Sequence, residues 1–389
     1  MSDSLMSTYA RLPVAFEQGK GAYLFDTQGN KYLDAIAGIA VCSLGHANPE
    51  VADAISDQAR KLIHTSNLYQ IPLQTALGDK LCALSGMEKV FFGNSGAEAN
   101  EAAIKLARLY GKKQGIEQPN IIVMSGSFHG RTLTTLSATG SRKVQAGFSP
   151  LVSGFVRAPF NEIAAIQKIA ENSSDIVAIL VEPVQGEGGV VVPDADYLSH
   201  IRNICDENNW LMMLDEIQTG MGRTGEWFAF QHHDFKPDVI TLAKALGNGV
   251  PIGACLAGAK AAEIFAPGNH GSTFGGNPLA SRAALAVIHT LETKNLVANA
   301  KNMGRYLLEN LQQELNGTQG VTDIRGHGLM IGIELDRNCA DLVTQALEHK
   351  LLINVTADKT IRLLPPLILT KEQADSIVDT ITILIKNFL

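Results

Sequence analysis

The chain has 389 residues, of which 46% are hydrophobic, so its length suits about two domains with ample core. Its 32 lysines and arginines and 39 aspartates and glutamates give a formal net charge of −7, and both signs are mixed along the chain. Nucleic acids and anionic membrane surfaces bind basic patches, which this balance disfavours. We therefore expect neither a nucleic acid nor a membrane as a partner.

Two further features indicate a cytoplasmic protein. The five cysteines are odd in number, scattered, and form no C-x-x-C motif, which is typical of buried thiols rather than of a disulfide framework. The N-terminal residues lack the basic and apolar regions of a signal peptide, and no apolar run approaches the ~18 residues of a membrane span. The neighbours His232 and His233 have no further ligands at a suitable spacing, so we expect no metal site.

The first part of the chain predicts an arm and a hairpin. Residues 1–20 are expected to form a loosely structured arm. Residues 22–33 contain two short apolar runs around the turn sequence Asp26-Thr-Gln-Gly-Asn, which predicts a β-hairpin. Apolar residues at helical spacing then run from Pro49 to His64. We therefore assign residues 1–45 to an N-terminal arm and hairpin.

The stretch from Val90 to Arg108 predicts a short strand that turns into an alanine-rich helix. Gly93, Asn94, Ser95 and Gly96 form the turn. The free N–H groups and the positive end of such a helix can bind an anion such as phosphate. The alternative is a plain strand-to-helix turn in which Ser95 is the N-cap. The stretch matches neither a P-loop nor a G-x-G-x-x-G motif.

Strands and helices alternate from this point, which predicts an α/β fold with a mostly parallel sheet and helices on both faces. The expected strands cover residues 121–124, 176–181, 211–214 and 238–242. Phe128, Glu182, Asp215 and Lys244 each follow one of these strands. Because open α/β sheets bind ligands at the carboxyl ends of their strands, these four residues are candidates for one site.

Lys244 and Asp215 together indicate a pyridoxal phosphate site. Burial lowers the pKa of a lysine and makes its amine a nucleophile, as a Schiff-base lysine requires. An aspartate at the end of a neighbouring strand suits the pyridinium nitrogen of that cofactor. The alternative is a salt-bridged loop lysine and a helix-capping aspartate, and either residue alone favours that alternative.

The pattern changes near residue 276, where Asn277 and Pro278 are suited to begin a helix. Two helices, a glycine-rich strand and further short strands follow, and Thr370 and Gln373 predict a capping box on the last helix. We expect residues 46–275 to form a large cofactor-binding domain and residues 276–389 a smaller α+β domain. Arg362 is the one charge in an apolar run, so it either points outward or clamps a carboxylate.

Together these motifs resemble the class III (ω-amino) aminotransferases, a family of fold-type I pyridoxal-phosphate enzymes. The resemblance covers nearly the whole chain and is greatest to the acetylornithine branch of bacterial arginine biosynthesis. Its most specific part runs from Asp215-Glu-Ile-Gln-Thr-Gly to Lys244. Further matches are Asn94-Ser-Gly-Ala-Glu-Ala-Asn-Glu, Ser127-Phe-His-Gly-Arg-Thr and Gly275-Gly-Asn-Pro-Leu-Ala.

The resemblance implies a role for each cofactor-binding residue. Lys244 would hold pyridoxal 5′-phosphate covalently and then act as the general base. Asp215 would keep the pyridine nitrogen protonated, Gln218 would bond the phenolic oxygen, and Phe128 would stack on the ring. The phosphate would lie on Ser95, Gly96 and Ala97, with Thr273 contributed by the second subunit of a homodimer.

The resemblance also implies the substrates. The enzyme would move the δ-amino group of N2-acetyl-L-ornithine to 2-oxoglutarate, giving N-acetyl-L-glutamate 5-semialdehyde and L-glutamate. Arg131 would bind the far carboxylate of the donor, Ser272 would reach the partner's substrate, and Arg362 would hold the α-carboxylate of glutamate. Glu182 would pair with Arg362 while the δ-amine reacts, unless it merely caps the glycine-rich loop after it.

Several alternatives stay open at this point. Succinylornithine, ornithine, 4-aminobutyrate and succinyldiaminopimelate are alternative amino donors. A nicotinamide dehydrogenase is disfavoured because the chain has no G-x-G-x-x-G motif. A non-catalytic protein of the same fold is disfavoured because a retired enzyme need not keep both Lys244 and Asp215.

Overall fold

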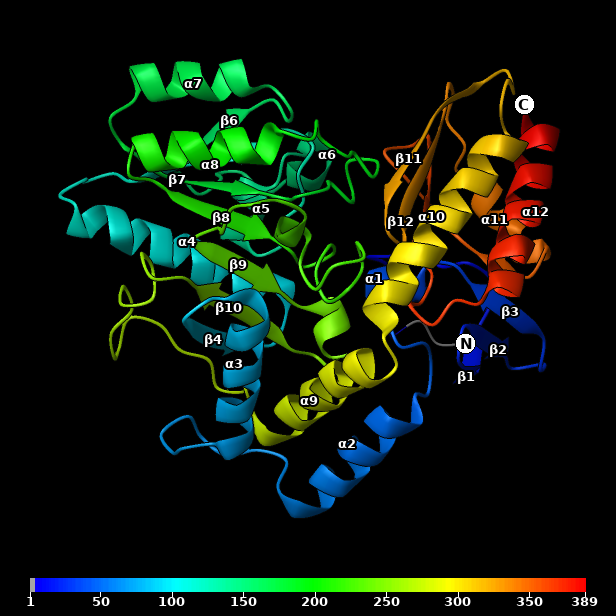
Figure 1. The fold of residues 1–389 in the computed structure, drawn as a ribbon, viewed down its shortest axis with the longest axis horizontal. Coiled ribbons are helices and arrows are strands. Elements are labelled where there is room, and N and C mark those ends of the chain that lie inside the picture. Colours follow the sequence, from blue (N-terminus) through cyan, green and yellow to red (C-terminus); the bar gives the residue numbers. More distant parts are fainter. Residues whose placement is uncertain (1–3) are drawn as a thin grey trace.

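The computed structural model describes residues 4–389 and arranges them around a seven-stranded sheet with two four-stranded sheets beside it (Figure 1). In this part of the chain, no helix is both long and apolar enough to cross a membrane. The N-terminal and C-terminal sheets lie together on one side of the molecule, and the large sheet occupies the other.

The central sheet explains the buried apolar runs of the sequence. Its strand order is β4 (Lys89–Gly93), β10 (Gly253–Ala257), β9 (Val239–Leu242), β8 (Leu211–Asp215), β7 (Ile176–Val181), β5 (Asn120–Met124) and β6 (Phe155–Ala158). In this sheet β10 pairs antiparallel with both of its neighbours, β4 and β9, and the other described pairings are parallel. Every residue of β7, β8, β9 and β10 is buried, as expected for a sheet covered on both faces. The predicted fold class is thus confirmed.

Alternate residues of the central strands pack against different helices. Leu211 and Met213 of β8 belong to the core beneath α4 (Gly96–Lys113). Met212 and Leu214 belong to the opposite core, which contains α8 (Tyr197–Glu207) and, beyond it, α7 (Ile163–Asn172). By the same alternation, Asp215 at the end of β8 faces α4.

The C-terminal part forms an antiparallel sheet with helices on one side. Its strand order is β11 (Val321–His327), β12 (Met330–Leu335), β15 (Thr360–Leu363) and β14 (Asn354–Thr356). The helices are α10 (Leu296–Glu314), α11 (Leu342–Glu348) and α12 (Lys371–Phe388). The predicted capping box of the last helix is present: Thr370 accepts from the backbone N–H of Gln373, and Gln373 accepts from that of Thr370.

The N-terminal hairpin is completed by a distant segment. The order of the third sheet is β1 (Phe16–Lys20), β2 (Tyr23–Asp26), β3 (Lys31–Asp34) and β13 (Leu351–Leu352), and β13 pairs in parallel with β3. Below the sheets in Figure 1, α2 (Pro49–Lys61) and α3 (Pro72–Ser85) pack against α9 (Pro278–Thr293). The short helices are α1 (Ala37–Ala40), α5 (Leu133–Ala138), α6 (Arg142–Gln145), η1 (Ala229–His232) and η2 (Lys244–Leu246).

A buried arginine joins three parts of the chain. The guanidinium of Arg223 donates to the carbonyl oxygens of Leu329 and Pro365, at 3.0 and 2.5 Å, and to the hydroxyl of Ser43, at 3.1 Å. Only 1% of Arg223 is exposed, and burial lowers its pKa to about 9. The contact therefore connects the loop after β8 to the C-terminal part of the chain and to the segment between α1 and α2.

Candidate active site

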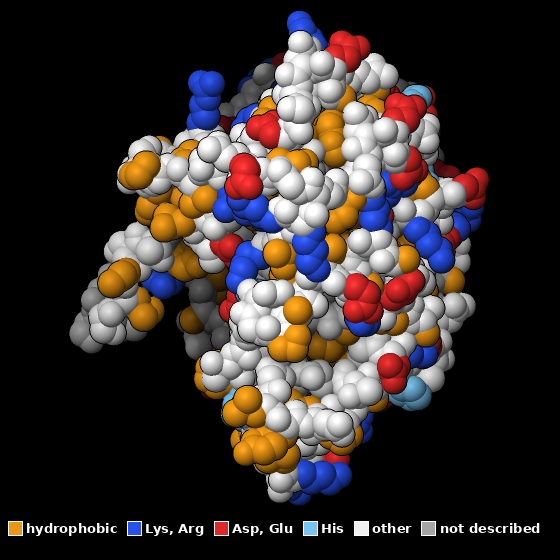
Figure 2. All heavy atoms as spheres, turned by 90° about the vertical axis from the view of Figure 1, so that its left-hand side faces the viewer, with side chains coloured by type: hydrophobic (Ala, Val, Ile, Leu, Met, Phe, Trp, Pro, Cys, Tyr) orange, Lys and Arg blue, Asp and Glu red, His pale blue; other side chains and the backbone are white. Residues whose placement is uncertain are grey.

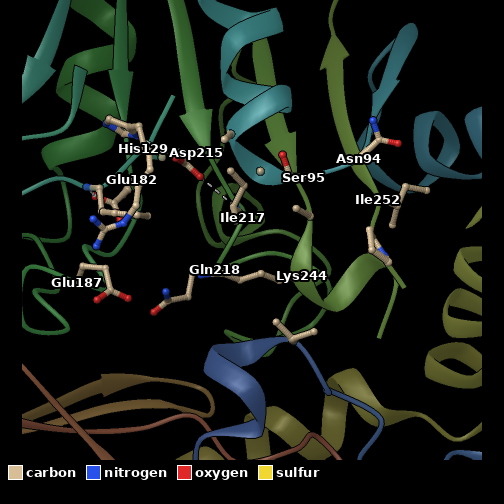
Figure 3. A pocket seen from close by; sticks show the side chains of 18 of the residues that line it. Asn94, Ser95, His129, Glu182, Glu187, Asp215, Ile217, Gln218, Lys244 and Ile252 are labelled. Atoms are coloured by element: carbon tan, nitrogen blue, oxygen red, sulfur yellow. Dashed lines mark hydrogen bonds and ion pairs between the residues drawn. The ribbon is translucent and has the colours of Figure 1, made fainter. Parts of the chain in front are cut away.

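A cavity of about 410 Å³ lies at the carboxyl ends of the central strands (Figure 3). The turns and loops after β4, β5, β7, β8 and β9 line it. The structure therefore brings together the sequence-predicted residues Ser95, Gly96, Ala97, Phe128, Arg131, Glu182, Asp215, Gln218 and Lys244. In Figure 3, Asp215, Ile217, Gln218 and Lys244 surround the cavity, with Glu182 and Glu187 on one side and Ser95 on the other.

Asp215 is the buried acid of the cavity, with 4% of its surface exposed. One carboxylate oxygen, Oδ2, accepts from Nδ2 of Asn100 at 2.7 Å and from Nδ1 of His129 at 2.8 Å. The other oxygen, Oδ1, accepts from the backbone N–H of Ile217 at 3.1 Å. The Asn100 amide and the backbone N–H of Ile217 can only donate, so these two contacts orient the Asp215 oxygens as acceptors.

Lys244 follows β9 directly and has a positive φ of 45°. A non-glycine residue in this conformation is uncommon and is often found at functional sites. Desolvation, together with the nearby guanidinium of Arg362, lowers the pKa of Lys244 to about 8. About a tenth of the amine is therefore neutral, and hence nucleophilic, at pH 7, against well under a thousandth for an ordinary lysine.

The N-terminus of α4 points its first turn at the cavity. The Ser95 hydroxyl accepts from the backbone N–H of Glu98 at 3.2 Å, so Ser95 is the N-cap of the helix. The first N–H groups of a helix have no acceptor within it, which leaves those of Gly96 and Ala97 for an anion. A Cβ at Gly96 would lie 2.7 Å from Cδ1 of Ile217, so only glycine allows this approach.

Phe128, Ile217 and Arg131 define the walls of the cavity. Phe128 and Ile217 present an aromatic and an aliphatic side chain to it. The guanidinium carbon of Arg131 lies 5.9 Å from the centre of the Phe128 ring, and Arg131 is exposed. Arg131 is thus free to meet a carboxylate that enters from solvent.

In this structure Arg362 pairs with Glu187 rather than with Glu182, the partner predicted for it while the δ-amine reacts. The Nη1 atom of Arg362, which is fully buried, donates to Oε1 of Glu187 at 2.7 Å and to Oε1 of Gln218 at 3.3 Å. Although burial opposes ionisation, Arg362 lowers the pKa of Glu187. Glu187 reaches Arg362 because the loop after β7 is held against the C-terminal sheet. Arg325 of β11 donates hydrogen bonds to the carbonyl oxygens of Gly189 and Val190 in this loop.

Glu182 instead stays at the end of β7. Its carboxylate accepts from the backbone N–H of Phe128 at 3.0 Å and from that of Gly186 at 3.4 Å. Burial, together with the negative charge of Asp215, raises the pKa of Glu182 well above its usual range. The geometry matches the alternative in which Glu182 caps the loop that follows it.

Ser272 and Thr273 lie outside the cavity in the described part of this chain. Ser272 accepts hydrogen bonds from the Asn94 side chain at 3.2 Å and from the backbone N–H of Gly275 at 3.0 Å. Thr273 is exposed. A single chain therefore does not bring these two residues to its own Lys244.

The sequence analysis missed Asn100, His129, Ile217 and Glu187. Asn100 is a polar residue on an alanine-rich helix face, and His129 follows Phe128 directly, so both carried a weak signal. Ile217 reads as an ordinary core residue. Glu187 lies in the glycine-rich loop, and no local sequence signal shows that it, rather than Glu182, would contact Arg362.

The residues of the cavity fit pyridoxal phosphate. An acid at one end suits an aromatic nitrogen, the N-terminus of α4 suits a phosphate, and the walls of Phe128 and Ile217 suit a flat ring. Lys244, beside them, supplies the amine that an aldehyde requires. The fold and the cavity together define a pyridoxal-phosphate-dependent enzyme.

Comparison with known proteins agrees with this class. Residues 5–385 match the family model of the class-III aminotransferases, and the chain belongs to that family and uses pyridoxal 5′-phosphate. The acetylornithine aminotransferase of Nitrosomonas europaea is 58% identical over 385 residues, covering 99% of this chain and 98% of the relative. That of Aquifex aeolicus is 50% identical over 372 residues, covering 95% and 96%.

Solved structures of the family have the same fold. The ornithine aminotransferase of Toxoplasma gondii superposes with a TM-score of 0.96 at 33% identity, covering 99% of this chain and 93% of that one. The acetylornithine aminotransferase of Elizabethkingia anophelis gives a TM-score of 0.88 at 34% identity, covering 98% and 96%.

Proposed function

We propose that the chain transfers the δ-amino group of N2-acetyl-L-ornithine to 2-oxoglutarate in arginine biosynthesis, giving N-acetyl-L-glutamate 5-semialdehyde and L-glutamate. The relatives from Nitrosomonas europaea and Aquifex aeolicus are named for this activity, and each covers nearly the whole chain. The single observation that carries the chemistry is that Lys244 and Asp215 line one cavity.

Each residue of the cavity has a role in this proposal. When bound, pyridoxal phosphate supplies a ring that withdraws electrons from the amine-bearing carbon of the substrate. The Nζ atom of Lys244 would take the proton from that carbon and deliver it to the cofactor instead of returning it to the same carbon, as a base with a pKa near the operating pH can. Asp215 would hold a proton on the ring nitrogen, Gln218 would bond the phenolic oxygen, and Phe128 would orient the ring. The turn Ser95-Gly96-Ala97 would hold the phosphate.

Two arginines bind the carboxylates of the two substrates in this proposal. Arg131 is exposed beside Phe128 and binds the carboxylate of acetylornithine, which lies far from the reacting δ-amine. Arg362 is buried and binds the carboxylate next to the α-amine of glutamate. Glu187 neutralises Arg362 while acetylornithine reacts and moves aside when glutamate enters.

A substrate panel tests the proposed donor. Acetylornithine, succinylornithine, ornithine, 4-aminobutyrate and succinyldiaminopimelate are each supplied with 2-oxoglutarate, and kcat/KM is measured for every donor. We expect acetylornithine to rank first. A clearly higher kcat/KM for ornithine or 4-aminobutyrate would replace the proposed donor while leaving the aminotransferase chemistry in place.

We also propose a homodimer in which Ser272 and Thr273 complete the partner's site. Two loops carry an exposed apolar patch consisting of Leu62, Ile63, Leu68, Tyr69 and Phe274. Asn67 joins these loops by donating to the carbonyl oxygens of Ser272 and Gly275. Figure 2 shows hydrophobic side chains gathered toward the lower end of one face. A patch of this kind, next to Thr273, suits a second copy of the chain.

Subunit mixing tests the shared site. Lys244→Ala and Thr273→Ala chains are mixed under conditions of subunit exchange, and activity is followed with time. In a mixed dimer, one site has both an intact Lys244 and an intact Thr273, so we expect activity above that of either variant alone. A fully active monomer in sedimentation would contradict the proposal.

Two further proposals concern the cellular location and the domain boundaries. The free thiols of all five cysteines, which lie in the described part of the chain, support a cytoplasmic location. The proposed domains are an N-terminal arm and hairpin at 1–45, a large domain at 46–275 and a small domain at 276–389. Limited proteolysis with mass spectrometry would locate the boundaries.

A further inference from the structure

Asn100 is a buried amide on the inner face of α4, with no exposed surface. Its neighbours on this part of the helix are mostly alanines, among them Ala99, Ala102, Ala103 and Ala107, which pack against the central sheet. A polar side chain here needs hydrogen bonds within the protein, because water does not reach it.

Three residues from other elements satisfy the Asn100 amide. Its Nδ2 atom donates to Oδ2 of Asp215 at 2.7 Å and to the backbone carbonyl oxygen of His129 at 2.8 Å. Its Oδ1 atom accepts from the hydroxyl of Thr241 at 2.7 Å. Both ends of the amide are thus occupied, so its orientation is determined by the network.

The register of the sheet produces this arrangement. Asp215 of β8 pairs with Thr241 of β9, and alternation places both side chains on the face covered by α4. Asn100 lies opposite this pair, one turn from Ala97. The same helix therefore presents its N-terminus to the cavity at Ser95–Ala97 and contacts Asp215 through Asn100.

His129 completes the network around the acid. Its Nδ1 atom lies 2.8 Å from Oδ2 of Asp215, within hydrogen-bond distance of the acid. Its Nε2 atom is buried without a hydrogen-bond partner among residues 4–389.

We propose that Asn100 is a positioning residue that couples the phosphate-binding turn to Asp215, so that one rigid helix sets the distance between the two ends of the cofactor. The inference rests on the pyridoxal-phosphate-dependent activity proposed above. It requires Asn100 to influence cofactor binding and rate, whereas a residue that only fills space would influence stability alone.

The test compares Asn100→Ala with Asn299→Ala. Asn299 is half-buried and also donates two hydrogen bonds, to the carbonyl oxygens of Leu367 and Leu369, but lies away from the cavity. Three quantities are measured: the Kd of the apoenzyme for pyridoxal 5′-phosphate from tryptophan fluorescence, the kcat and KM of the holoenzyme, and the Tm.

We expect Asn100→Ala to raise the Kd and lower kcat by roughly tenfold to a hundredfold, the range for losing a hydrogen bond to a charged group. The KM for the amine should change little, because Asn100 does not reach the substrate. Asn299→Ala should lower the Tm while its Kd and kcat stay within about twofold of the wild type. If Asn100→Ala behaves like Asn299→Ala, the positioning role is refuted.

Two variants cover the case in which Asn100→Ala does not fold. Thr241→Val keeps the size of the side chain but frees the amide to rotate, and it should raise the Kd in the same direction by a smaller factor. Asn100→Asp keeps the acceptor for Thr241 but removes the donor to Asp215, and it should raise the Kd more. Unchanged Kd values in both would overturn the proposal. A wild-type enzyme with no transaminase activity would instead refute the proposed function.

Discussion

Arg362 and Glu187 form an ion pair of 2.7 Å between a fully buried guanidinium and a carboxylate with 37% of its side chain exposed. Arg362 lies in β15 of the C-terminal sheet, and Glu187 lies in the loop after β7 of the central sheet. In the described part of the chain, Nη2 of Arg362 has no hydrogen-bond partner. The amides of Asn354 and Gln218 also accept hydrogen bonds from Arg362, so within the residues that the structure describes Glu187 is its only acidic partner and Nη2 stays unpaired. This arrangement suits a group that binds a carboxylate in only one half-reaction.

Replacing Glu187 should change the two half-reactions differently. Glu187→Gln removes the counter-charge of Arg362 and leaves the guanidinium available to the α-carboxylate of glutamate. We expect the single-turnover rate with glutamate to rise by roughly tenfold relative to the rate with acetylornithine. Glu182→Gln is the control, because Glu182 does not contact Arg362 here. Equal changes in both rates for Glu187→Gln would rule out the exchange of partners.

Arg131→Ala should weaken the binding of acetylornithine. The exposed guanidinium has the freedom to pair with the distant carboxylate of this donor. Loss of one charge-assisted contact should raise the KM for acetylornithine about tenfold, with a smaller effect on glutamate, whose reacting end is held by Arg362. Steady-state kinetics with each amine measure this. A larger loss with glutamate would reverse the roles assigned to the two arginines.

Asp215→Asn should keep the fold and lose most of the rate. An amide cannot hold the ring nitrogen in its protonated form, and its NH2 group would meet the donors of Asn100 or His129. We expect kcat to fall at least about a hundredfold, as for other preorganised charges, while far-UV circular dichroism is unchanged. A kcat within about threefold of the wild type would make Asp215 a structural residue only.

Lys244 should make the stability of the apoenzyme depend on pH. Its pKa of about 8 in the folded chain lies below the ordinary value for an unfolded lysine, about 10.4. The unfolded chain therefore binds the proton more tightly, and the resulting loss of stability is complete below pH ~8 and is relieved as the pH rises toward ~10.4.

Lys244→Met tests this sign. The variant apoenzyme should be more stable than the wild type at pH 7, and urea unfolding should show the difference shrinking between pH ~8 and ~10. The variant should also lose transaminase turnover, because no other amine replaces Nζ as the base. A difference that grows with pH, or turnover close to the wild-type rate, would contradict the assignment.

Arg223 should be a major stabilising contact between the parts of the chain that it joins. Arg223→Met leaves the carbonyl oxygens of Leu329 and Pro365 without their buried donor. Unsatisfied buried acceptors predict a loss of roughly 2–5 kcal/mol in the free energy of unfolding. Arg337→Met is the control, because its pair with Asp336 is half-exposed and screened by solvent, so its loss should change the stability little. Equal losses in urea unfolding would show that the Arg223 contacts add little.

The sequence by itself was sufficient to predict the class of fold and the centre of the site. Local apolar runs predict buried strands, and a parallel sheet brings the residues that follow those strands to one edge. Lys244 and Asp215 lie in the cavity for that reason, and the capping box at Thr370 was predictable because its partners are three residues apart. Each of these signals involves residues close together in the sequence, so it can be recognised from the sequence alone.

Only the tertiary structure decided which distant side chains meet. Glu187, five positions after Glu182, pairs with Arg362 because the loop after β7 is carried across to the small sheet. Likewise, β13 completes the N-terminal sheet by pairing with β3, over 300 residues earlier in the chain. Asn100 reaches Asp215 because the register of β8 and β9 turns both strands' side chains toward α4. Each of these contacts depends on the path of a loop or the placement of a helix across a sheet, which local sequence patterns do not encode.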